Sequence, residues 1–232
     1  MKQISEFFSL FLAAFIGLTS CTSGSTDNNQ ESGNASDTMM NHTTMKNDSS
    51  NKADVSNWPE ASKMAVDEIT GKYGPPDGVT ANELIWLNKG TWAKICITKM
   101  ESKHSFPIKH TDMMTTTITY KVPEDKMDDL GKFDGSVTFD RTQGTMSARC
   151  DKEGNNFLAL NLANDIVTGK KTVLSARKAY GDIIKLKMKG GNPLYMVKLT
   201  FTPKANTADP DKNTTGLTKE DVSKAVTQNN NK

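Results

Sequence analysis

The chain has 232 residues, of which 29 are Lys or Arg and 27 are Asp or Glu, giving a formal net charge of +2. So small a basic excess argues against a nucleic-acid-binding protein, which would carry a strong positive patch. Without the polar segments at its two ends the chain keeps roughly 150 residues, the size of one domain with its own core. No motif points to a cofactor, and none is expected.

The first 21 residues have the pattern of an export signal. Phe7 to Leu18 is an apolar run that is too short to span a bilayer comfortably. It ends in Leu18-Thr19-Ser20-Cys21, which resembles a bacterial lipobox, the site where a peptidase cuts before the cysteine and the thiol receives a diacylglycerol. The resemblance implies a lipoprotein with residues 1–20 as signal peptide and Cys21 as the lipidated residue. Thr22 in place of Asp is typical of outer-membrane lipoproteins in many diderm bacteria, so we expect a lipid-anchored envelope protein facing the periplasm.

Both ends of the remaining chain are polar. Residues 22–56 are rich in Ser, Thr, Asn and Asp, and they have too little apolar surface to offset the entropy of ordering. They predict, after the lipidated Cys21, a disordered tether of 35 residues with a root-mean-square span of about 30–35 Å. Residues 205–232 predict a disordered tail with one marginal helix over Thr218–Val226. A single domain is therefore predicted over 57–204.

The first half of this domain predicts a helix followed by a hairpin. Asn57 can cap a helix that has Pro59 in its first turn and stops at Gly74. Two strands joined by an Asn-Lys-Gly turn follow, and after a further loop comes a strand of alternating apolar residues. These strands are predicted at about 84–87, 92–99 and 114–122.

The second half begins with a short helix after Pro123 and a strand over Ser136–Arg141. The strongest helix runs from near Asp151 to Gly169 and has a broad apolar stripe. A shorter helix over 173–180 and two strands over 183–189 and 194–202 complete the predicted elements. Because hairpins dominate this order, we predict an α+β fold with a mainly antiparallel sheet and helices packed on one face.

Two stretches resemble a family of bacterial domains of unknown function, over most of residues 58 to 180. They are Trp58-Pro59-Glu60-Ala61-Ser62 with Lys72-Tyr73-Gly74, and Met146-Ser147-Ala148-Arg149-Cys150-Asp151-Lys152-Glu153 leading into Asn156-Phe157-Leu158-Ala159-Leu160-Asn161-Leu162. Because no activity is assigned to that family, the resemblance implies no catalytic residues.

His104 and His110 are the two histidines of the predicted domain. On a straight strand they would lie about 20 Å apart, so they could share a metal only if the loop at Pro107 turned back on itself. Cys150 and Asp151 could then supply further ligands suited to zinc. The alternative is that one histidine is solvated and the other is bonded to the backbone.

Cys150 precedes the strongest predicted helix. A helix N-terminus and Arg149 would lower the pKa of its thiol, which would suit a nucleophile paired with a histidine. Export also places Cys96 and Cys150 in an oxidising compartment, where they could form a disulfide. The alternative for both cysteines is a packed, free thiol.

Lys185, Lys187 and Lys189 would line one face of the predicted strand over 183–189. Such a face could contact anionic headgroups or an acidic partner. The alternative is a solvated face, or an edge strand protected from aggregation by its lysines.

These patterns favour a non-enzymatic binding or assembly module that is anchored to a membrane, with another envelope protein as a potential partner and no nucleic acid. The alternative is an enzyme or metal-binding protein that uses His104, His110 and Cys150. Convergence of those three side chains on one pocket would favour the alternative.

Replacing Cys21 with Ser should release the protein from the membrane. Two or more acyl chains anchor a lipoprotein stably, and the variant has no thiol to receive them. Fractionation of cells, with the mass of each protein measured, tests this expectation. An unchanged membrane fraction and an unchanged mass relative to the parent would contradict it.

Overall fold

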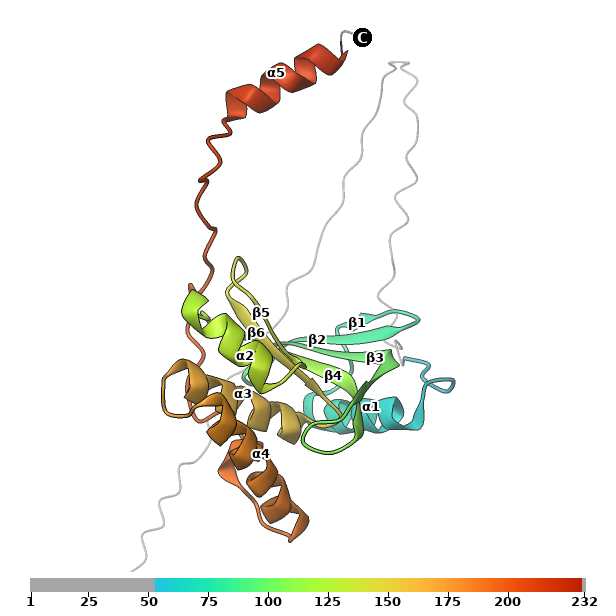
Figure 1. Cartoon of the computed structure of the whole chain (residues 1–232). Helices are drawn as coiled ribbons and strands as arrows, with labels where there is room; N and C mark the ends of the chain where they lie inside the picture. Colours follow the sequence, from blue (N-terminus) through green and yellow to red (C-terminus); the bar gives the residue numbers. More distant parts are fainter. Residues whose placement is uncertain (1–52, 231–232) are drawn as a thin grey trace, which may run out of the picture. The chain divides into compact units, whose positions relative to one another are not determined.

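The computed structural model describes residues 53–230 (Figure 1). The predicted signal peptide, Cys21 and nearly all of the predicted tether lie outside the described residues. The elements in chain order are α1 (Glu60–Tyr73), β1 (Gly78–Val79), β2 (Glu83–Lys89), β3 (Trp92–His104), β4 (His110–Thr119), the 3-10 turn η1 (Glu124–Lys126), α2 (Met127–Phe133), β5 (Val137–Asp140), β6 (Thr145–Cys150), α3 (Glu153–Val167), α4 (Val173–Met188), the 3-10 turn η2 (Leu194–Met196) and α5 (Lys219–Asn230).

The six strands form one sheet in the order β1-β2-β3-β4-β6-β5, and every neighbouring pair is antiparallel. The helices α1 and α3 pack against one face of this sheet, and α4 packs on α3 (Figure 1). These features confirm the predicted α+β fold with an antiparallel sheet and helices on one face. Both edge strands are short, since β1 has two residues and β5 has four.

Side chains along the strands alternate between the face that the helices cover and the opposite face. Trp86, Ile95, Thr116 and Ala148 lie opposite one another across four strands, and all four are buried beneath the helices. Their neighbours point to the other face, which is only partly covered. Trp86 and Trp92 are both core residues.

The helix α3 is the centre of the core. Its predicted apolar stripe is confirmed, because Leu158, Leu162 and Ile166 are all buried. The opposite side of α3 is buried as well, since α4 and the segment after it cover that side. This explains why polar residues such as Asn161 are also buried in the helix.

The predicted strand over 194–202 is wrong. Only a 3-10 turn forms there, and the segment is held by a side chain in place of a neighbouring strand. The Asn161 amide nitrogen donates to the carbonyls of Tyr195 and Lys198 at 3.1 and 2.8 Å, and its oxygen accepts from the Thr200 backbone at 2.7 Å. The backbone hydrogen bonds that a strand would need are thus supplied by α3.

The predicted strand over 183–189 is also wrong, because α4 continues to Met188. Ala176 and Tyr180 are buried, and Ile183 and Ile184 pack against the core at the same helical spacing. Lys185, Lys187 and Lys189 therefore surround the end of a helix and do not line one face of a strand. The alternation of lysines with apolar residues imitated a strand only in the last turn of this helix.

The strand β6 was missing from the prediction. Its residues Met146, Ala148 and Cys150 alternate with partly or fully exposed ones, and all three are buried. The segment is short and contains Ser and Ala, which are weak strand formers. Its pairing with both β4 and β5 supplies the stabilisation that propensity does not.

Contacts with the folded body continue past the predicted boundary at Lys204. Thr207 is buried and its hydroxyl donates to the Gly144 carbonyl at 2.6 Å. Arg141 forms ion pairs with Asp209 and Asp211 at 3.4 and 2.6 Å. Part of the predicted disordered tail, residues 205–211, is therefore held against the turn between β5 and β6.

Leu162→Ala should destabilise the protein by about 2–5 kcal/mol, the usual effect of emptying a core site. Leu174→Ala is a matched control in which the side chain is 81% exposed, and it should change stability by less than about 0.5 kcal/mol. Denaturant unfolding of both variants measures the difference. A neutral Leu162→Ala would show that the stripe of α3 does not pack as described.

Candidate metal centre

The end of the β3–β4 hairpin brings the two histidines together. The strand β3 has a register shift between Ile97 and Ser102, after which His104 pairs with His110 and Ser102 pairs with Asp112. Directly paired residues share a face, and so do residues two apart on one strand. His104, His110 and Asp112 therefore point to the same side, toward the helices. The loop containing Pro107 does turn back, as a shared metal would require.

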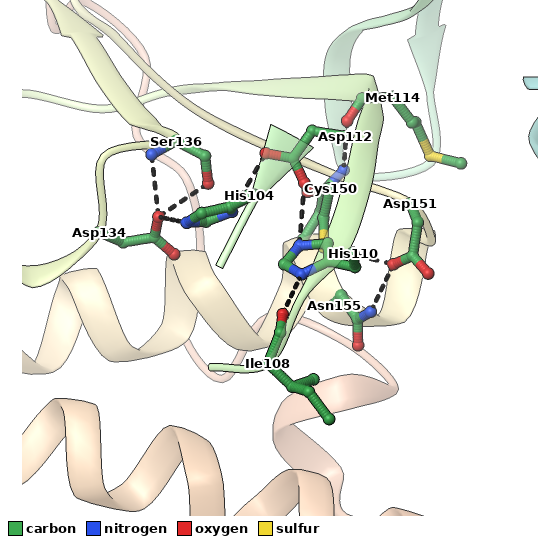
Figure 2. Close-up of polar contacts among 11 residues, drawn as sticks. His104, Ile108, His110, Asp112, Met114, Asp134, Ser136, Cys150, Asp151 and Asn155 are labelled. Carbon is green, nitrogen blue, oxygen red and sulfur yellow. Dashed lines mark hydrogen bonds and ion pairs between the residues drawn. The ribbon is translucent and has the colours of Figure 1, made fainter. Parts of the chain in front are cut away.

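The Asp112 carboxylate lies beside the two imidazole rings and reaches a nitrogen of each (Figure 2). Its Oδ2 is 3.1 Å from Nδ1 of His104 and its Oδ1 is 2.9 Å from Nε2 of His110. One ligand atom from each of these three residues falls within 4.8 Å of the others. Asp112 is only 2% exposed, and both histidines are largely buried. A buried carboxylate needs a compensating charge or hydrogen bonds at this position.

Hydrogen bonds do not fully satisfy the group. Although Nε2 of His110 is close to Oδ1 of Asp112, the ring nitrogen is not aligned with the oxygen, and Oδ1 has no hydrogen-bond partner among the described residues. Nδ1 of His104 also lacks one. Oδ1 of Asp112 and Nδ1 of His104 are thus both buried and without a hydrogen bond.

The outward nitrogen of His110 has a hydrogen-bond acceptor, and that of His104 lies near a carboxylate. Nδ1 of His110 donates to the carbonyl oxygen of Ile108 at 2.7 Å. Nε2 of His104 lies 3.5 Å from Oδ1 of Asp134, which accepts hydrogen bonds at 2.9 Å from both the backbone and the hydroxyl of Ser136 (Figure 2). Each ring is therefore oriented with its other nitrogen toward Asp112. Metal-binding histidines show this arrangement, in which an outer acceptor fixes the ring and leaves the inner nitrogen as ligand.

Cys150 approaches the site from β6. Its Sγ is 3.4 Å from Nε2 of His110 and donates to Oδ1 of Asp151 at 3.3 Å. The same carboxylate oxygen accepts from the Asn155 amide at 2.7 Å. A cavity of about 110 Å³ borders His110, Cys150 and Asp151 and is closed on the far side by Tyr180 and Ile184 of α4.

An aromatic contact fixes the loop that joins the two histidines. The ring of Phe106 meets Tyr180 edge-on at 5.1 Å, and the Arg177 guanidinium lies over its face at 3.8 Å. Arg177 also donates to the Phe133 carbonyl at 2.5 Å. The helix α4 thus holds the loop, and with it the positions of His104 and His110.

The surroundings raise the pKa values of two groups at the site, His110 and Cys150. The Asp112 carboxylate, followed by the Cys150 thiol, raises the pKa of His110 to about 11, so that the metal-free ring carries a second proton at neutral pH. Burial raises the pKa of Cys150, although His110 opposes the shift. This corrects the expectation of an activated thiol: Cys150 is buried, and Arg149 is exposed and projects toward the other face of the sheet.

The geometry does not suit a Cys–His nucleophile. In such a pair the cysteine and the orienting carboxylate contact opposite ring nitrogens of the histidine. Here Cys150 and Asp112 both face Nε2 of His110, and Nδ1 is occupied by the Ile108 carbonyl. What the arrangement can do is present two imidazole nitrogens and a carboxylate to one cation.

The sequence-predicted candidates meet only in part. His104 meets His110, and Cys150 contacts His110 and Asp151, but Cys150 and Asp151 do not reach His104. Cys96 and Cys150 are both free thiols. Cys96 pairs with Thr115 and Cys150 pairs with Met114, so they project to opposite faces of the sheet and cannot form the disulfide that the sequence allowed. The three lysines of α4 do not border the cavity beside His110.

The sequence reasoning missed Asp112, which is the central residue of the site. The signal was present, because a His-x-Asp pair on a strand places both side chains on one face. The strand was predicted to begin at Met114, four residues too late, and that placed His110 and Asp112 in a loop.

Comparison with protein-family models, with curated proteins and with solved structures finds no match to this chain. Among residues 53–230, no helix is long and apolar enough to cross a membrane. The case for a function therefore depends on the geometry of the site and on the sequence.

The metal-free protein should lose stability as the pH rises above about 6.5. The folded His110 keeps a proton that the unfolded chain releases near pH 6.5, so its stabilisation is full below that pH and is lost as the pH approaches 11. Below about pH 8.5, where cysteine starts to titrate, the loss is at most about 1.4 kcal/mol per pH unit. Urea unfolding with a chelator present measures the slope. His110→Gln should flatten it, and equal slopes for both proteins would contradict the assignment.

Proposed function

We propose that the folded domain binds a divalent transition metal, with zinc as the favoured ion, through His104, His110 and Asp112. The observation that carries this proposal is the buried Asp112 carboxylate, which lies between two imidazole nitrogens without a hydrogen bond to its Oδ1. A buried anion in this position is stabilised by a cation that all three groups can share.

A protonated His110 is the competing explanation, since it would form an ion pair with Asp112. Yet His110 forms no hydrogen bond with Oδ1 of Asp112 in the structure, although its Nε2 is 2.9 Å away. The ion pair would also leave Nδ1 of His104 unpaired. A metal ion in the space between the three groups would satisfy His104 and His110 together with the carboxylate. The ion pair therefore accounts for the charge but not for the arrangement of both rings.

The donor set favours zinc. Two imidazoles and one carboxylate are common zinc ligands, and the same set with open positions also suits ferrous iron. Two ligand atoms bound at about 2.1 Å with a tetrahedral angle lie about 3.4 Å apart. The carboxylate lies 3.1 and 2.9 Å from the two ring nitrogens, which is close to this separation.

Cys150 stays outside the three-residue set and contacts only His110 within it. Three protein ligands leave at least one coordination position for water or an exogenous ligand, which is typical of exchangeable and catalytic sites rather than structural ones. The small cavity beside His110 and Cys150 gives such a ligand room.

We further infer that this domain acts in the bacterial envelope, tethered through a lipidated Cys21. The lipobox-like sequence at Leu18 to Cys21 supports the anchor, and the polar composition of residues 22–56 supports a flexible connection. An outer-membrane location facing the periplasm is part of the same proposal, and Thr22 after the cysteine is its support. Together these features suggest a membrane-held metal-binding module.

Asp112→Asn should weaken zinc binding by more than about 100-fold, beyond the 10–100-fold loss typical of a residue that only orients a ligand. Asp134→Asn removes such an orienting residue from His104 and should fall within that range of about 10–100-fold. Competition with a chromophoric chelator gives the affinities, and elemental analysis of the dialysed protein gives the stoichiometry.

Asp151→Asn is the matched control. It removes a carboxylate that contacts Cys150 but does not belong to the three-residue set, and it should leave zinc affinity unchanged. The proposal fails if the parent protein binds no zinc or ferrous iron. It also fails if Asp112→Asn and Asp151→Asn bind as well as the parent while circular dichroism shows all three proteins folded.

A further inference from the structure

The segment after Asp182 has an unusual charge distribution. Five lysines and no acidic residue occur between Ile183 and Ala208, in a chain whose overall net charge is only +2. Three of these lysines lie within five residues at the end of α4, where they alternate with Leu186 and Met188. Three lysines are therefore clustered at the end of α4.

We call this surface the α4 tip and define it by Lys185, Leu186, Lys187, Met188 and Lys189, with Leu194, Val197 and Lys198 beside them. Its apolar members are exposed: Leu186 by 50%, Met188 by 76%, Leu194 by 53% and Val197 by 45%. Figure 1 shows the end of α4 projecting from the body on the side away from the sheet. The core uses none of these four side chains.

The tip is a well-defined structure rather than a frayed helix end. The Gly191 backbone donates to the Leu186 carbonyl and the Gly190 backbone donates to the Lys187 carbonyl, both at 3.0 Å. This pair of bonds is the Schellman motif, and it requires the left-handed conformation that Gly190 adopts with φ of 86°. A Cβ on Gly191 would lie 2.7 Å from the Leu186 side chain, so only glycine fits there without a shift. The turn thus fixes the position of Leu186 and its neighbours.

Internal ion pairs do not explain the lysines. Lys185 reaches Asp182 at 3.9 Å, and within the described part of the chain Lys187, Lys189 and Lys198 form no ion pair. By contrast, Lys132 and Lys178 elsewhere on the surface each pair with an aspartate one helical turn away. A solvated helix end would explain free lysines, but it would not explain four exposed apolar side chains among them. Protection of an edge strand, one alternative for these lysines, does not apply because the segment is a helix.

We propose that the α4 tip contacts the surface of a bilayer that contains anionic phospholipid. The lysines face the headgroup phosphates, and Leu186 and Met188 enter the boundary between headgroups and acyl chains. Each lysine near such a surface contributes about 1 kcal/mol of attraction, and exposed apolar side chains add to it by burial in the interface. The mixture of free lysines and exposed apolar residues is the combination that this surface favours.

The length of chain before the domain is compatible with this contact. Residues 22–56 would span about 30–35 Å if flexible, whereas the 16 residues of α4 measure about 24 Å. The tip could therefore reach the same membrane that holds the chain. Contact with the same membrane depends on the proposed anchor at Cys21, whereas the charge and exposure of the α4 tip do not.

The test uses residues 48–232, which form one compact unit and carry all the core residues found among residues 53–230. Because this fragment lacks Cys21, failure of the anchor and failure of the tip are distinguished. It should sediment with phosphatidylcholine vesicles that contain phosphatidylglycerol, and binding should weaken with added salt. Lys185→Gln with Lys187→Gln should lower the partition coefficient by about 25-fold.

Lys132→Gln with Lys178→Gln is the matched control, because it removes the same charge from exposed lysines outside the tip. It should bind nearly as the parent fragment does. Leu186→Ser with Met188→Ser keeps the charge and should also lower binding. The proposal is overturned if the parent does not bind anionic vesicles, if it binds pure phosphatidylcholine equally well, or if the control loses as much as the tip variant. An acidic protein as the true partner would give the first of these results.

Discussion

The burial of the Asp112 carboxylate is the constraint on which the functional end of this domain depends. A carboxylate that is 2% exposed needs compensating partners close by, and the hairpin places one histidine from each strand beside it. The register shift in β3 after Ile97 and the loop through Pro107 together set the pairing of His104 with His110. Asp134 and Ile108 then turn the two rings toward the carboxylate.

The packing outside the sheet supports the same geometry. Phe106 in the hairpin loop is held by Arg177 and Tyr180 of α4, and α4 itself packs on the largely buried α3. These contacts connect the hydrophobic core to the hairpin loop, and no disulfide links the two free cysteines. The cation–aromatic contact at Phe106 and the hydrogen bond from Arg177 to Phe133 are rigid, directional interactions that favour one loop conformation.

Much of the fold could be predicted because its elements carry strong local signals. The apolar stripe of α3 and the tight turn before Trp92 each fix an element without help from distant residues. The errors fall where tertiary contacts decide. Asn161 replaces a strand partner for residues 195–200, and β6 is stabilised by two neighbouring strands rather than by its own propensity. The site shows the same division: the two histidines were visible in the sequence, but the choice of Asp112 required the strand to begin at His110.

The two edge strands have a further consequence if the proposed anchor at Cys21 holds the protein on a membrane. Anchored proteins diffuse in the plane of the membrane, where frequent collisions bring the edge strands of neighbouring molecules together. A long exposed edge strand could pair with the edge strand of a neighbouring molecule and extend the sheet between them. Here one edge strand is the two-residue β1 and the other is the four-residue β5, so both are too short to pair extensively with a neighbouring molecule. Short edge strands of this kind would limit sheet-to-sheet association among copies crowded on a membrane.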